Sequence, residues 1–145
     1  MKDFFAEVGV LFSYPRHIVL LVSRFVLAYG FVQPASMKLH DLQGTTLFFK
    51  SLGIPFAHMF AYIVPTLETL GIVLLILGLF TRLISLFLAV IMVVAIFTVH
   101  LSNGFSVADN GFEIPLYYLI FSLIFISFGG GKYSLDYLFF EKGMQ

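Results

Sequence analysis

The chain has 145 residues and no cysteine. Without cysteine it has no disulfides, thiol redox relays or cysteine-ligated clusters, so any redox chemistry must use a bound cofactor or a partner protein. Glycine-rich phosphate loops, nucleophile elbows and basic nucleic-acid patches are absent as well. No Glu-x-x-His or His-x-x-x-His pair lies in an apolar run, so we predict neither a metal site nor a nucleic-acid partner.

Charged residues are scarce and apolar residues are abundant. Charged residues make up 11% of the chain and hydrophobic residues 60%, with a mean hydropathy of +1.02, which is far outside the soluble range. Four apolar runs, near residues 17–36, 57–79, 83–101 and 112–128, are long enough or nearly so to cross a hydrocarbon core of about 30 Å. We therefore predict an all-α membrane protein, with one domain over residues 1–145 and four transmembrane helices in an antiparallel up-down-up-down bundle.

Two other segments predict short helices that lie at the membrane interface. The N-terminal segment carries apolar residues on one face until Pro15 ends the helix. In the first outer loop, residues 45–52 precede Gly53 and Pro55, which are typical signals for the end of a helix.

Basic residues that flank the apolar runs predict the orientation. Two of them, Lys38 and Lys50, fall on one side of the membrane, and five fall on the other: Lys2, Arg16, Arg82, Lys132 and Lys142. The positive-inside rule then places both termini in the cytoplasm. Arg24 lies inside the first run and three further runs follow it, which indicates an uncleaved anchor rather than a signal peptide.

Arg24 and Glu68 are charged residues in the middle of the first and second apolar runs. A charge at bilayer depth costs roughly 2.5–3.5 kcal/mol, so each should face a partner, a cavity or a ligand. Helical spacing aligns Arg24 with Phe31, Ala35 and Lys38, and it aligns Glu68 with Gly71, Leu75, Gly78 and Arg82. Counting from the ends of the runs puts Arg24 and Glu68 at similar depth, so we predict a hydrogen bond between them. The pair either fixes the register of two helices or belongs to a ligand site, and the sequence leaves both interpretations open.

A second polar cluster is predicted near the outer face, where one leaflet would hold Lys38, His40, His100, Asn103 and Glu113. Glu113 and Tyr117 share a helix face, and a tyrosine hydroxyl can orient a carboxyl proton. Alternatively, Glu113 only stabilises the N-terminus of its helix. For a quinone, His and Lys would donate to the carbonyl oxygens, a nearby acid would pass protons, and aromatic residues would form the walls.

Several short motifs follow one another in order along the chain. They are Arg24, Phe31 and Lys38-Leu39; Phe49 with Leu52-Gly53-Ile54-Pro55; Glu68 with Gly71; Gly78-Leu79-Phe80-Thr81-Arg82-Leu83; His100 with Asn103-Gly104-Phe105; and Gly129, Gly131 and Ser134-Leu135-Asp136. From about Arg24 to about Asp136, this ordered set resembles the DoxX family of small four-span membrane proteins. One departure is Ala35, where the family usually has glycine, and a kink at the preceding Pro34 would replace the freedom that glycine gives.

The resemblance implies an inner-membrane protein of bacteria or archaea, linked in various members to quinone-dependent oxidoreductase complexes, to resistance to catechols and quinones, and to oxidative-stress complexes. We therefore expect a membrane subunit of such a system that binds a quinone or a lipophilic aromatic, without a covalently bound cofactor, beside an oxidoreductase partner subunit. The sequence leaves open whether the chain is catalytic. The alternative is a non-enzymatic membrane scaffold or assembly factor, and a small-solute transporter ranks below both. Gly71 and Gly78 suit close packing within the bundle or in a homo-oligomer.

Overall fold

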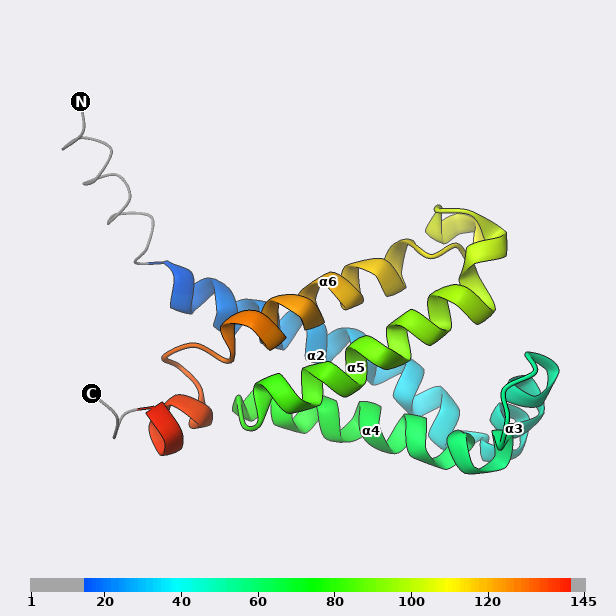
Figure 1. Ribbon diagram of the computed structural model, residues 1–145, viewed down its shortest axis with the longest axis horizontal. Coiled ribbons are helices and arrows are strands. Elements are labelled where there is room, and N and C mark those ends of the chain that lie inside the picture. Colours follow the sequence, from blue (N-terminus) through cyan, green and yellow to red (C-terminus); the bar gives the residue numbers. More distant parts are fainter. Residues whose placement is uncertain (1–14, 142–145) are drawn as a thin grey trace.

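The computed structural model describes residues 15–141, and all regular structure in this range is helical (Figure 1). The long helices are α2 (Arg16–His40), α4 (Ala57–Leu77), α5 (Thr81–Ala95) and α6 (Glu113–Phe128), with a short helix α3 (Leu42–Ser51) between α2 and α4. Helix α5 continues into a π-helical turn, η1 (Ile96–His100), and a 3₁₀ turn, η2 (Leu101–Asn103). Two further short turns are η3 (Val107–Asp109) and η4 (Tyr137–Glu141).

Within the part of the chain that the structure describes, three helices are long and apolar enough to cross a membrane: Arg16–His40, Ala57–Leu77 and the continuous stretch Thr81–Asn103. Helix α6 is equally apolar but has 16 residues, which at 1.5 Å per residue gives about 24 Å, somewhat less than a typical hydrocarbon core. The helix positions agree closely with the four apolar runs in the sequence. The predicted helix in the first outer loop is confirmed as α3, which Gly53 follows with φ 73°. The predicted N-terminal interfacial helix lies outside the described residues.

The core is formed by one stripe on each long helix, at the spacing of three and four residues that a helix requires. On α2 the buried residues are Leu20, Arg24, Leu27, Ala28, Phe31 and Ala35, and on α4 they are Ala57, Ala61, Pro65, Glu68, Gly71 and Leu75. The predicted inward faces are therefore confirmed, except that Arg82 is exposed. Gly71 lets α4 approach α5 closely, because a Cβ at this position would come within 3.0 Å of the Leu88 side chain.

The C-terminal segment closes one end of the bundle. Gly78 ends α4 with φ 66°, and α5 begins three residues later. The backbone N–H of Asp136 donates to the Gly78 carbonyl at 2.9 Å, while the Asp136 carboxylate accepts from the N–H groups of Phe80 at 2.6 Å and Thr81 at 2.8 Å. Asp136 thus caps the first turn of α5 from a distant part of the chain. Figure 1 shows the α4–α5 turn, the start of α2 and the C-terminal segment at the same end, and α3 and η1 at the other.

Candidate functional site

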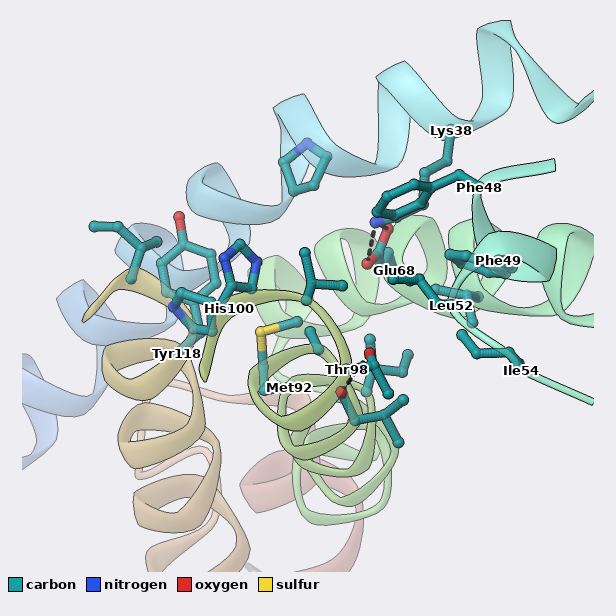
Figure 2. A pocket seen from close by; sticks show the side chains of 18 of the residues that line it. Lys38, Phe48, Phe49, Leu52, Ile54, Glu68, Met92, Thr98, His100 and Tyr118 are labelled. Carbon is teal, nitrogen blue, oxygen red and sulfur yellow. Dashed lines mark hydrogen bonds and ion pairs between the residues drawn. The ribbon is translucent and has the colours of Figure 1, made fainter. Parts of the chain in front are cut away.

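Glu68, near the middle of α4, is fully buried, and its partner is Lys38 from the last turn of α2. The Lys38 ammonium donates to both carboxylate oxygens, at 2.7 Å from Nζ to Oε1 and 2.8 Å from Nζ to Oε2 (Figure 2). Such charge-assisted bonds are short and strong, and they give both oxygens of the buried carboxylate a partner. The Lys38 side chain is 25% exposed, so the cation and not the anion has access to the surroundings.

The predicted pair between Arg24 and Glu68 is wrong. Arg24 lies at the closed end, where its Nη2 donates to the Tyr133 carbonyl and its Nη1 lies so close to Gly78 that a Cβ there would come within 1.6 Å. Gly78 is almost three helical turns from Glu68, or about 15 Å along α4. Counting depth from the ends of the apolar runs failed because α2 continues to His40, and this extra turn brings Lys38 level with Glu68.

Arg24 belongs to a separate buried cluster at the closed end of the bundle. Its Nε and Nη1 have no hydrogen-bond partner among the described residues, and neither do the hydroxyls of Thr81 and Ser85. Elsewhere in the long helices, hydroxyls such as that of Ser122 donate to the carbonyl four residues back, which Ser85 does not. Arg24 therefore joins α2 to the C-terminal segment rather than to Glu68.

The Lys38–Glu68 pair forms part of the wall of a cavity of about 750 Å³, a size typical of small-molecule sites. All four long helices, α3 and the η1 turn contribute to it, and most of the wall is apolar. Its polar side chains are those of Gln33, Lys38, Glu68, Thr98, His100, Asn110 and Tyr118. A second cavity of about 360 Å³ lies beside α3, and both cavities are lined by Pro34, Lys38, Phe48 and Phe49. Lys38 is therefore flanked by space on two sides, and Glu68 on one.

Irregular backbone surrounds the large cavity. Pro34 lacks an N–H, so the carbonyl of Gly30 has no partner within α2. The ring of Tyr118 lies on Gly30, where a Cβ would come within 2.3 Å of the tyrosine oxygen. On the opposite wall, the π-helical turn at the end of α5 brings His100 to the cavity, and such turns are frequent at functional sites. Neither Tyr118 nor the π turn was predicted from the sequence, although Gly30 and Pro34, four residues apart, mark a weakened stretch of helix.

His100 and Asn103 together hold the loop that joins α5 to α6. The Nδ1 of His100 lies 2.8 Å from the Asn110 carbonyl, and the Asn103 side-chain amide donates to the same oxygen at 3.2 Å. His100 also lines the cavity, whereas Asn103 lies outside its wall. The predicted neighbour His40 is exposed and bonded to the carbonyl of Ser36 within α2.

Glu113 and Tyr117 are bonded to each other, as their shared helix face predicts. The Tyr117 hydroxyl donates to Glu113 Oε1 at 3.1 Å, and Glu113 Oε2 accepts from the N–H of Val107 at 3.1 Å. Neither residue lines the cavity. Of the predicted polar residues, the cavity therefore gathers Lys38, Glu68 and His100. Arg24, Asn103 and Glu113 bind backbone groups elsewhere, and Tyr117 binds the Glu113 carboxylate.

The long apolar helices and the buried ion pair between them define a multi-pass membrane protein. The DoxX family model matches residues 19–101, and the chain belongs to this family. Two relatives from Haemophilus influenzae, both described as "Uncharacterized protein", are 33% identical over 125 residues (83% of this chain and 83% of the relative) and 34% identical over 131 residues (88% and 95%). A third, "Putative oxidoreductase CatD" from Bacillus subtilis, is 30% identical over 122 residues, which are 83% of this chain and 87% of the relative. No solved structure matches the chain at a significant level.

Proposed function

We propose that this chain is an inner-membrane subunit that binds a quinone or a similar lipophilic aromatic in the large cavity. The observation that carries the proposal is the fully buried Glu68, held by Lys38 in the wall of an otherwise mostly apolar space of about 750 Å³. An ion pair at this depth is costly to keep in a membrane, and such residues usually mark a ligand or proton site. Apolar walls with a few convergent polar groups are what a lipophilic ring requires.

Each part of the cavity has a role in this proposal. Lys38 would donate to a ring oxygen, because its ammonium has three hydrogens and Glu68 takes at most two. The rings of Phe48 and Phe49 would pack against the ligand ring, and the second cavity would give Lys38 a route for protons. The chain has no cysteine, so electrons would pass between the ligand and a partner oxidoreductase, in keeping with the description of the Bacillus subtilis relative as an oxidoreductase.

The proposal includes the topology. Helix α6 is taken as the fourth span, antiparallel to α5, with both termini in the cytoplasm because Arg16, Arg82 and Lys132 lie toward that side. A 16-residue span can be accommodated by local thinning of the bilayer.

A scaffold or assembly factor is the alternative. It is favoured by the closed end of the bundle, where Arg24 and Asp136 bind backbone groups of other segments. In that case Lys38 and Glu68 would likewise only fix the register of α2 and α4.

Mass spectrometry of small molecules retained by the protein in mild detergent tests the proposal. We expect the parent to retain a quinone or related aromatic near one per chain, and the Glu68→Gln variant to lose it. The matched control is Glu113→Gln, which also removes a carboxylate but lies off the cavity wall and should keep the ligand. If folded parent and folded variants all retain nothing, the scaffold is correct; if Glu68→Gln retains as much as the parent, the ligand lies elsewhere.

A further inference from the structure

Two walls of the cavity, one formed by α2 and α4 and the other by α5 and η1, differ in the hydrogen bonds that their ionic and polar groups Lys38, Thr98 and His100 can offer. Figure 2 shows Lys38 and Glu68 on one side and His100 on the other. Both oxygens of Glu68 are occupied by Lys38, so the Lys38 side presents a remaining N–H donor. The side formed by α5 and η1 is different, as the partners of His100 and Thr98 reveal.

The tautomer of His100 follows from its contact with the loop. A backbone carbonyl can only accept, so the Nδ1 that lies 2.8 Å from the Asn110 oxygen must carry the hydrogen. In a neutral imidazole the other nitrogen, Nε2, is then an acceptor. Among the described residues no donor is bonded to Nε2, and His100 lines the cavity. The imidazole therefore offers its free lone pair to whatever the cavity holds.

Thr98, two residues before His100 in the chain, also offers only an acceptor to this cavity. Its hydroxyl donates its single hydrogen to the Val94 carbonyl at 2.8 Å, which leaves only lone pairs for a ligand. Both polar side chains that α5 and η1 contribute to the cavity wall thus accept hydrogen bonds and do not donate them. A ligand oxygen that only accepts would face these lone pairs without a hydrogen between them.

We infer, on the basis of the proposed function, that the cavity binds the reduced form of its ligand, a hydroquinone or phenol, in preference to the quinone. A hydroquinone hydroxyl can accept from Lys38 at one end of the ring and donate to His100 Nε2 or Thr98 Oγ1 at the other. A quinone oxygen can accept from Lys38 but can donate to neither group. Sites built to bond a substrate hydroxyl discriminate strongly against analogues that lack it. His100 and Thr98 are thereby the specificity-determining residues.

The test is equilibrium dialysis of the full-length protein in lipid nanodiscs, without oxygen, against tetramethyl-1,4-hydroquinone and tetramethyl-1,4-benzoquinone. Empty nanodiscs correct for partition of each probe into lipid. We expect the parent to bind the hydroquinone about tenfold more tightly or better. The preference should fall below about threefold in His100→Gln, whose amide can donate as well as accept, and should also fall in Thr98→Val.

The control is Asn103→Ala, which loses a contact to the same Asn110 carbonyl but lies off the cavity wall, and which should keep the full preference. Equal binding of the two probes by the parent, or tighter binding of the quinone, would overturn the inference and leave aromatic binding in place. A preference that survives in both His100→Gln and Thr98→Val would overturn the assigned residues. If neither probe binds the parent above empty nanodiscs, the proposed function fails, and the inference fails with it.

Discussion

Removing Lys38 and removing Glu68 should have unequal effects on stability, although the two side chains form one ion pair. Glu68 is fully buried, so Lys38→Met leaves a carboxylate in the bundle without its cation. Breaking a buried pair in this way costs about 3–5 kcal/mol of unfolding free energy. Glu68→Gln leaves an amide oxygen as one acceptor for a lysine that is already 25% exposed, and its expected cost is about 1 kcal/mol.

Combining Lys38→Met with Glu68→Gln shows why the loss of Lys38 lowers stability. If the cost of Lys38→Met comes from the stranded carboxylate, then adding Glu68→Gln should restore about 2 kcal/mol of it, because the buried charge is gone. The assay is denaturant unfolding of the purified protein in detergent, followed by circular dichroism. Lys50→Met is the matched control, because Lys50 is an exposed lysine at the end of α3 and its loss should change stability by less than about 0.5 kcal/mol.

Two outcomes would refute this account of the pair. Equal costs for Lys38→Met and Glu68→Gln would mean that the bond itself, and not the burial of the anion, determines the energy. A double variant that is as unstable as Lys38→Met alone would mean that the lysine contributes through packing of its aliphatic chain.

The closed end and the topology give further predictions. Gly78→Ala should cost at least about 1–2 kcal/mol in the same unfolding assay, because φ is 66° and a Cβ would displace the Arg24 guanidinium; an unchanged midpoint would contradict this packing. Ser85→Ala should leave stability unchanged or raise it by up to about 1 kcal/mol, because it removes a buried hydroxyl that has no partner within residues 15–141. A loss above about 1.5 kcal/mol would contradict this and show that the hydroxyl makes a stabilising hydrogen bond. Since the chain has no cysteine, Ser51→Cys should react with an impermeant maleimide on intact cells and Lys132→Cys only after the cells are opened; the reverse pattern would invert the proposed topology.

Periodicity and end signals in the sequence were sufficient to predict the helices and their inward faces. The buried positions on α2 and α4 recur every three or four residues, and Gly53 and Gly78 mark helix ends with positive φ. These features depend on local geometry, which the sequence specifies directly. Membership of the DoxX family was also predicted from the sequence. Many of the motifs that indicated it are turn and helix-end residues, whose role is likewise local.

The partners of the buried charges could not be predicted in the same way. Which cation reaches Glu68 depends on the axial offset between α2 and α4, and that offset is set by packing and by the length of α2 beyond its apolar run. The place of Tyr118 in the cavity wall could not be predicted either, because its ring comes to lie on Gly30 only when α6 packs against α2. A tyrosine in an apolar run looks the same in the sequence whether it faces a cavity or lipid.

The charged residues at the two ends of the bundle have different roles: those at the closed end hold segments together, and those at the other end line the cavity. At the closed end, Arg24 and Asp136 bind backbone atoms of other segments, so their loss removes contacts that hold the chain together. At the other end, a proline and a π-helical turn weaken regular backbone beside the cavity, and Lys38 keeps a donor in excess of what Glu68 needs. A fold that only had to be stable would gain nothing from these interruptions, because regular helix satisfies more backbone groups. Their concentration around one cavity is therefore the physical reason to seek the ligand there, and substitutions at the closed end should lower stability where those at the cavity end change binding.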